Sequence, residues 1–222
     1  MRESRPLPSL GAALAVALAV VAAGCGGPHQ PRRTTVLTVF RVHGGTLRAE
    51  RAEVPAARST PAAALGALGL HVPVNVARGT AHVSIDTLSP DRIAEVVYTL
   101  TGLDGIRRVD VAGRSGLVRA DVVRYVPAIL VESPAAGQRV PTTFAVSGTA
   151  SVFEATLVIE LRRRGMLIER RTVTATAGAP SRGTFRATLH AGSTGPATVI
   201  AFAPSAADGT PQHVQRVGVK VS

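Results

Sequence analysis

Short segments in which apolar and polar residues alternate run through the second half of this 222-residue chain. Phe185, Ala187 and Leu189 are the apolar members of one such segment, and residues 215–221 form another. Because successive side chains of a strand point to opposite faces, this period of two predicts strands that bury one face.

Seven strands are predicted between Pro127 and Ser222, separated by turn-forming pairs such as Ala136-Gly137 and Asp208-Gly209. They are 129–131, 143–147, 155–162, 166–176, 184–189, 197–202 and 215–221. Short strands at this spacing predict an all-β sandwich over residues 127–222, although the Cys…Trp…Cys set of antibody domains is absent.

Residues 34–125 mix strand and helix patterns. Strands are predicted at 36–42, 46–54, 81–85 and 109–112, and helices at 62–70 and after Ser89. Thr60 is the expected N-cap of the first helix, with Pro61 at its first position, and Ser89 caps the second. Apolar residues of the second helix at i, i+3, i+4 and i+7 give it one apolar face, and Gly102 ends it. The order β-β-α-β-α-β predicts an α+β domain, a small β-sheet with two helices on one face.

The N-terminus carries a targeting pattern. Arg2 and Arg5 precede the apolar run 10–23, which is shorter than the ~20 residues of a membrane span and is followed by Cys25. Small residues before this lone cysteine resemble the lipobox of bacterial lipoproteins. We therefore predict a signal peptide at 1–24, lipidation of Cys25 and a tether at 25–33. The alternative is a signal peptide cut elsewhere that leaves a free thiol.

The first domain resembles a known family. Residues 95–101 (EVVYTLT), followed by 105–109 (GIRRV), resemble the close of the GerMN domain, a sporulation and spore-germination domain, and 79–86 (GTAHVSID) fits the same pattern. The resemblance covers roughly residues 34–113. GerMN domains are similar to ring-building domains of sporulation assemblies, so the resemblance admits self-assembly.

The second domain also carries a resemblance. Ser133-Pro134, 144–148 (FAVSG) and 152–155 (VFEA) resemble the immunoglobulin-like domain of bacterial spore germination, and the likeness continues through 183–185 (GTF). That domain is found attached to GerMN domains, so the order lipobox, GerMN, immunoglobulin-like sandwich is itself a match. Neither family implies a catalytic residue.

The residues give no independent sign of catalysis. The six histidines form no helical i, i+4 pair. His71 and His82 could meet in space as ligands, but exposed or hydrogen-bonded histidines are the favoured interpretation. No nucleophile elbow, P-loop or dinucleotide fingerprint follows a predicted strand. We therefore predict no catalytic residue, no metal site and no cofactor. An enzymatic function is the least favoured of three function classes, and no residue is assigned to it.

One carboxylate stands out because Glu154 lies between Phe153 and Ala155 in an otherwise apolar stretch. A charge there is costly unless it is hydrogen-bonded or solvated. The structural interpretation is that Glu154 accepts backbone N–H groups at a strand corner and holds Phe153 in the core. The functional interpretation is a ligand contact.

The formal net charge is +11, and 24 of the 25 cationic side chains are arginine. Five arginines crowd one predicted hairpin, where Glu160 and Glu169 lie close enough to neutralise two of them. The plain interpretation is a solvated hairpin. The functional one is that Arg163, Arg164 and Arg170 contact anionic envelope polymer or lipid headgroups. Nucleic acid is disfavoured as a partner because secretion separates the protein from it, and because no aromatic side chains that could stack on bases accompany the arginines.

Together these patterns predict a lipid-anchored protein on the outer face of the cytoplasmic membrane, in the bacterial cell envelope. The expected function is a non-catalytic interaction or scaffold module of the sporulation or germination type, with other envelope proteins as partners. The alternative is a binding protein for cell-wall polymer or a small ligand.

Overall fold

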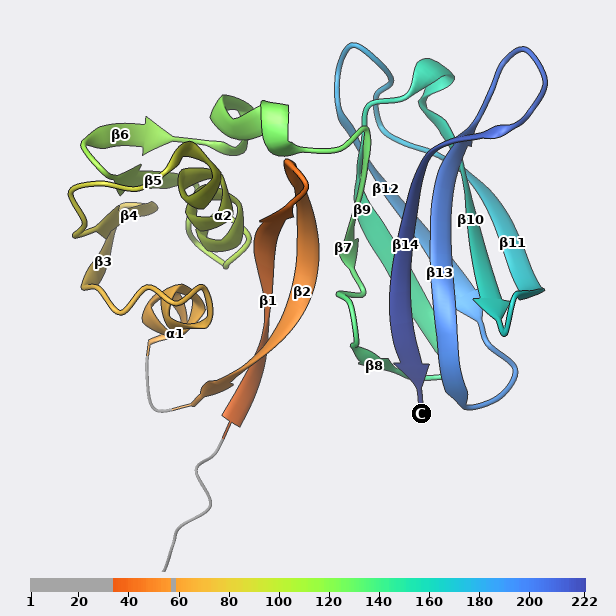
Figure 1. The fold of residues 1–222 in the computed structure, drawn as a ribbon, viewed down its shortest axis with the longest axis horizontal. Coiled ribbons are helices and arrows are strands. Elements are labelled where there is room, and N and C mark those ends of the chain that lie inside the picture. Colours follow the sequence, from red (N-terminus) through yellow and green to blue (C-terminus); the bar gives the residue numbers. More distant parts are fainter. Residues whose placement is uncertain (1–33, 57–58) are drawn as a thin grey trace, which may run out of the picture. The chain divides into compact units, whose positions relative to one another are not determined.

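The computed structural model describes residues 34–56 and 59–222, and its first half contains two small sheets and two α-helices (Figure 1). Its elements are β1 (Thr34–His43), β2 (Thr46–Pro55), α1 (Thr60–Ala67), β3 (Val74–Ala77), β4 (Thr80–Val83), α2 (Pro90–Leu100), β5 (Arg108–Val111), β6 (Arg114–Leu117) and the 3-10 helix η1 (Arg119–Tyr125). Strands β1 and β2 form a separate antiparallel pair, and the other four strands are ordered β3-β4-β5-β6.

Strands β1 and β2 are joined by a tight turn, as the sequence predicted. Gly44 and Gly45 both have positive φ, 56° and 79°, which is the backbone that a two-residue hairpin turn requires. The register runs without a shift from His43 opposite Thr46 to Thr34 opposite Pro55. The turn chemistry therefore sets the pairing of the whole hairpin.

Helix α2 is the helix that the apolar pattern predicted. Ser89 is its N-cap and accepts a hydrogen bond from the Arg92 amide at 3.4 Å. Its apolar face is buried, and Tyr98 packs edge-on against Phe40 of β1 with ring centroids 5.0 Å apart. Two polar residues of α2 also bind the backbone of β1. Thr99 Oγ1 accepts a hydrogen bond from the Phe40 amide, and Glu95 Oε1 accepts one from the Val42 amide, both at 2.9 Å.

Several details of the first half differ from the prediction. The hairpin does not join the other strands in one sheet, and β3, β6 and η1 were not expected. Strand β3 has no buried residue and β6 contains Gly116, so neither shows the alternation that marks a strand. Helix α1 begins at Thr60 with Ser59 as its N-cap, so the predicted cap at Thr60 was wrong by one residue. The α+β class of this half agrees with the structure.

The second half is a sandwich of two sheets (Figure 1). Its elements are β7 (Ile129–Ser133), β8 (Arg139–Val140), β9 (Thr143–Ala150), the 3-10 turn η2 (Phe153–Ala155), β10 (Thr156–Arg163), β11 (Met166–Thr174), β12 (Gly183–His190), β13 (Gly195–Pro204) and β14 (Pro211–Val221). One sheet has the order β11-β10-β13-β14-β8 and the other β12-β9-β7. Each of the seven predicted strands is present, and the short β8 is additional.

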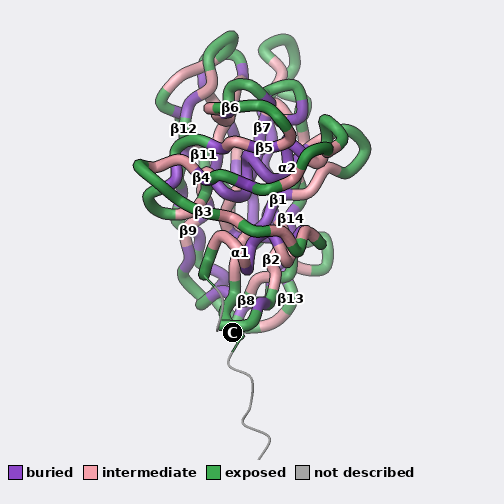
Figure 2. The backbone as a smooth tube through the Cα atoms, turned by 90° about the vertical axis from the view of Figure 1, so that its left-hand side faces the viewer, coloured by how far each residue is buried: buried purple, intermediate pink, exposed green. Residues whose placement is uncertain are grey.

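The sandwich core consists almost entirely of aliphatic residues. Leu157, Ile159 and Leu161 of β10 are fully buried, and they meet the alternating buried residues of β12 from the other sheet. Figure 2 shows buried positions along the strands and exposed positions on the turns. At about 1.5–3 kcal/mol for each large side chain removed from water, this aliphatic interior supplies the main stabilisation of the sandwich.

Strand β7 contributes to both hydrophobic cores. Ile129 and Val131 are buried in the sandwich cluster, whereas Leu130 between them is buried in the cluster of the first half, which also includes Ala135. The alternation of a strand explains this division, because its two faces meet two different neighbours. The first core therefore depends on a residue that lies beyond the predicted domain boundary at 125–127.

Arg119 of η1 links the same two regions through polar contacts. Its guanidinium lies over the Tyr98 ring, 4.3 Å from the centroid, and donates to both carboxylate oxygens of Glu132 at 3.1 and 3.0 Å. Both hydrogen bonds come from one nitrogen, Nη1, so this is a single charge-assisted contact shared by the two carboxylate oxygens. The link joins helix α2 to the end of β7.

Candidate functional site

The predicted lipidation residue, Cys25, lies outside the described residues, as do the predicted signal peptide and tether. In the part of the chain that the structure describes, no helix has the length and apolar character needed to cross a membrane.

The predicted basic hairpin is formed by β10 and β11. Arg164 and Gly165 occupy its turn with φ of 49° and 83°, so the turn is of the type that suits a tight hairpin. The two strands pair antiparallel, with one register shift next to Arg162. The arginines of this hairpin therefore divide among the turn and the two faces of the sheet.

Glu160 neutralises part of this hairpin. Its side chain is only 3% exposed, and it accepts Arg162 Nε at 2.6 Å and Arg170 Nε at 2.8 Å. Burial alone raises the pKa of this carboxyl, but the hydrogen bonds from the two guanidinium groups outweigh burial and lower the pKa below its ordinary value. Arg170, one of the three expected contact residues, is paired with this carboxylate while its side chain stays 55% exposed.

The other two expected contact residues differ from each other. Arg163 donates to the backbone oxygen of Ser193 at 2.6 Å and also to its hydroxyl, so it ties the hairpin to the β12–β13 loop. Arg164 has no ion pair among the described residues. Arg171 pairs with Glu169, as predicted for one of the neutralised arginines. Of the three expected contact residues, Arg164 is therefore the one whose guanidinium has neither an ion pair nor a side-chain hydrogen bond to a described residue.

Further cations lie beside Arg164 on the outer face of the same sheet. The register aligns Arg170, Glu160, Ile200 and Arg216 in one row across four strands. A second row contains Arg162, Thr198 and Gly218, and a third contains Pro196, Lys220 and Arg139. We call this surface the basic face; its charged residues are Arg139, Glu160, Arg162, Arg164, Arg170, Arg216 and Lys220.

Three members of the basic face were missed by the sequence reasoning. Arg139, Arg216 and Lys220 lie far from the hairpin in sequence and reach it only through pairing of β14 with β13 and β8. Lys220 is the only lysine of the chain, so the composition singles it out, but nothing in the sequence shows that it lies beside the hairpin. None of these three has an ion pair among the described residues.

A shallow groove of about 450 Å³ crosses the basic face. Its charged lining residues are Arg162, Arg164 and Lys220, and its floor includes Thr198 and Gly218. Guanidinium and ammonium groups around an open floor suit an anionic ligand. The groove holds no carboxylate among its lining residues.

The structural interpretation of Phe153 and Glu154, in which Glu154 holds Phe153 in the core, was wrong. Phe153 is 70% exposed and is not held in the core. Glu154 has φ of 52°, and its backbone oxygen accepts the Thr156 hydroxyl, but its carboxylate makes no hydrogen bond to a described residue. Val152 and Ala155 supply the buried side chains of this corner instead.

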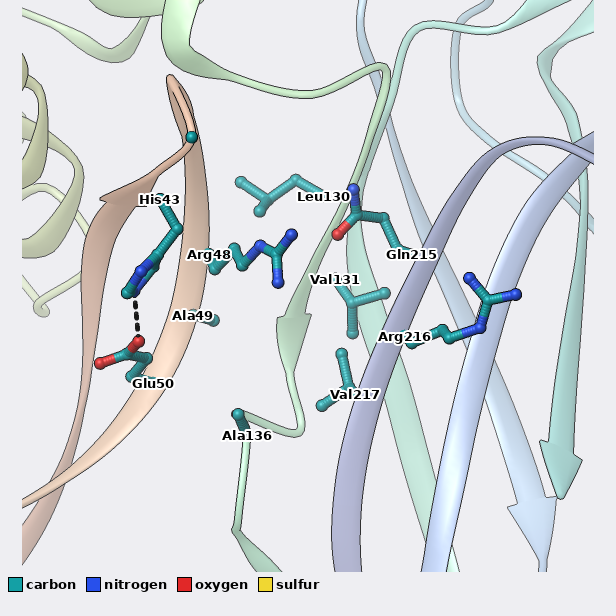
Figure 3. A pocket seen from close by; sticks show the side chains of 11 residues that line it. His43, Arg48, Ala49, Glu50, Leu130, Val131, Ala136, Gln215, Arg216 and Val217 are labelled. Carbon is teal, nitrogen blue, oxygen red and sulfur yellow. Dashed lines mark hydrogen bonds and ion pairs between the residues drawn. The ribbon is translucent and has the colours of Figure 1, made fainter. Parts of the chain in front are cut away.

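A second cavity of about 340 Å³ lies between β2, β7 and β14 (Figure 3). Arg48 of β2 and Gln215 of β14 point toward each other across it, while Arg216 points away. At its edge His43 Nε2 lies 2.6 Å from Glu50 Oε1, and Arg41 Nε lies 3.3 Å from Glu50 Oε2. These groups can hydrogen-bond a small polar molecule, and Glu50 already contacts both Arg41 and His43.

The described residues contain no cluster of three or more metal-ligating side chains. His82, one of the two histidines considered as ligands, pairs through Nδ1 with Asp110 Oδ2 at 2.9 Å. This is a partly exposed cross-strand pair on β4 and β5, which the parallel register places side by side.

The comparisons with known proteins agree with the fold of the second half. No match was found among curated proteins or among solved structures. The resemblance of residues 34–113 to GerMN stays a prediction. Residues 128–210 match the family model described as the immunoglobulin-like domain of bacterial spore germination, which confirms the prediction for this part of the chain.

Proposed function

We propose that this chain is a lipid-anchored protein of the bacterial cell envelope that acts as a non-catalytic interaction or scaffold module. The observation that carries the proposal is the match of residues 128–210 to the immunoglobulin-like domain of bacterial spore germination. The lipobox-like segment around Cys25 supports the anchor, and the resemblance to GerMN supports a role of the sporulation or germination type.

The free edge of the sandwich supports an interaction role. Strand β11 is the edge of the five-stranded sheet, and its first three residues, Met166, Leu167 and Ile168, are 65%, 46% and 40% exposed. An edge strand offers unpaired backbone groups, and a partner strand can add to them while covering apolar side chains. We propose that a neighbouring envelope protein binds along β11.

The anchor is tested by replacing Cys25 with serine. The wild-type protein should partition with membranes and incorporate labelled palmitate, because two acyl chains make retention stable where one gives only marginal binding. The Cys25→Ser variant should appear in the soluble fraction without label. A wild-type protein that takes up no palmitate would rule out the anchor.

The interaction role is tested by a photo-crosslinking residue at Ile168 in living cells. A matched control carries the same residue at Thr188, which is exposed on the other sheet. The expected result is one recurrent envelope protein crosslinked from position 168 and not from position 188. Equal yields from both positions, or none from 168, would contradict binding along β11.

The alternative function, binding of cell-wall polymer, is favoured by one observation, the basic face. Glycan or polymer fragments crosslinked in place of a protein would support it. If the ligand is instead a small molecule, the cavity between β2, β7 and β14 is the place where it would bind (Figure 3).

A further inference from the structure

The groove on the basic face contains a glycine that the fold does not require. Gly218 lies in the interior of β14, where glycine weakens a strand because it has no side chain to pack and loses more conformational freedom on folding. A Cβ atom at this position would meet nothing within 4 Å. By contrast, a Cβ at Gly148 of β9 would lie 2.0 Å from the Leu130 oxygen, so glycine is obligatory there. Packing therefore explains Gly148 but not Gly218.

The open space above Gly218 is bordered by cations. Gly218 is aligned with Thr198 and Arg162 across the sheet, and Lys220 follows two residues later on the same face of β14. Arg164 lines the groove from the hairpin turn. Neighbouring strands are about 4.8 Å apart and alternate residues of one strand about 6.7 Å, so these cations surround an opening only a few strands wide.

Charge on this face is strongly unbalanced. Glu160 is its one described carboxylate, and both of its oxygens are taken by Arg162 and Arg170. Arg139, Arg164, Arg216 and Lys220 have no ion pair among the described residues. Four cations without carboxylate partners on one sheet face are complementary to a ligand with several negative charges.

We propose that the groove over Gly218 binds an extended polyanion that carries repeated phosphate groups, with Arg164 and Lys220 as its direct contacts. Arginine binds phosphate oxygens two at a time and lysine binds them as a point charge. The absence of a side chain at Gly218 lets the backbone of such a chain lie against the sheet. The inference rests on the proposed function only for the envelope location of the ligand.

A soluble polymer fits this groove better than a bilayer surface does. The floor at Gly218 lies below the long side chains on either side, where a thin chain can enter and a flat layer of headgroups cannot. Leu167, opposite Arg162 at the β11 edge, is the exposed apolar residue in these rows, whereas Ile200 at their centre is partly buried.

The test uses the full chain in a non-ionic detergent and fluorescently labelled long-chain inorganic polyphosphate, with binding followed by anisotropy. Wild-type protein should bind at low salt and release polyphosphate as salt screens the contacts. Gly218→Thr should lower the affinity at least tenfold while its melting temperature stays the same or rises, because a β-branched residue favours a strand. Such a variant separates loss of binding from loss of folding.

Charge variants complete the test. Arg164→Ser and Lys220→Ser should each weaken binding and reduce the slope of log affinity against log salt by about one. The matched control is Arg186→Ser, which removes one exposed arginine from β12 of the other sheet and should bind as wild type does. Since none of these variants replaces Cys25 or a residue of β11, membrane retention and the crosslink from position 168 should persist in all of them.

Three results would overturn the proposal. The first is a Gly218→Thr variant with wild-type affinity, and the second is an Arg186→Ser variant that loses as much affinity as Lys220→Ser, since binding would then reflect net charge alone. The third is displacement of polyphosphate when phosphatidylglycerol is added to the micelles, which would assign the face to a membrane surface.

Discussion

Truncation of Leu130 to alanine should destabilise the first half of the chain, although Leu130 lies on a strand of the sandwich. Its side chain is 1% exposed and packs in the cluster of the first half. Leucine-to-alanine changes in a core cost about 2–5 kcal/mol, through the lost burial and the cavity that remains. Since the position is fully enclosed, we expect a loss of about 3 kcal/mol.

The two tyrosines make this effect measurable. The chain has no tryptophan and only Tyr98 and Tyr125, and both lie in the cluster that contains Leu130. Tyrosine fluorescence during a urea titration therefore reports the first core, while far-ultraviolet circular dichroism reports the whole chain. With a urea slope of about 1–3 kcal/mol per M, a loss of 3 kcal/mol lowers the tyrosine midpoint by roughly 1–3 M.

Ile129→Ala is the matched control, because Ile129 is equally buried but faces the sandwich core. It should shift the circular dichroism transition and leave the tyrosine transition in place. A Leu130→Ala variant with the wild-type tyrosine midpoint would refute the assignment of Leu130 to the first core. Identical shifts of both probes in both variants would show that the halves unfold as one unit, contrary to the predicted division at 125–127.

Two further variants test other parts of the structure. Glu160→Gln should lower the free energy of unfolding by about 2 kcal/mol at neutral pH, because it removes charge-assisted hydrogen bonds to Arg162 and Arg170. Since the pKa of Glu160 is lowered in the folded protein, its contribution is complete above the ordinary value of 4.5 and is lost as the pH falls below it. Thermal unfolding should therefore show a smaller gap between variant and wild type at pH 3 than at pH 7, and an unchanged gap would contradict the ion pair. Gly148→Ala should cost about 2–3 kcal/mol in a urea titration, because its Cβ would lie 2.0 Å from the Leu130 oxygen; a variant as stable as wild type would show that β7 and β9 are less closely packed there.

The strands of the sandwich could be predicted because each is marked locally. Alternation such as that around Phe185 places one face inside, and glycine or proline turns mark the ends. Helix α2 was equally predictable, since Ser89 marks its start and the apolar face shows which side is buried. Strand β3 was missed because none of its residues is fully buried; it pairs with β4, and only Val74 packs partly against the core.

The candidate site was only partly predictable, because its residues meet through sheet register. The hairpin around Arg164 is visible in the sequence as a local excess of arginine, but Lys220 and Arg139 join it through strand pairing over long sequence separations. The sequence also indicated that Glu160 and Glu169 neutralise two of the hairpin arginines, but only the strand pairing shows that Arg170 is one of the partners of Glu160. Local charge counts indicate how many cations a segment has, and tertiary pairing determines which remain unneutralised.

The contacts of the β1–β2 hairpin limit how copies of this protein can join. The outward amides of Phe40 and Val42 are bound by Thr99 and Glu95, and on the opposite side the Ala49 oxygen accepts the Ala136 amide. Another chain cannot extend this hairpin at these positions without first displacing a helix or a loop. A filament or ring that grows by adding strand to strand therefore cannot use the hairpin at these positions and needs another stretch of free strand edge.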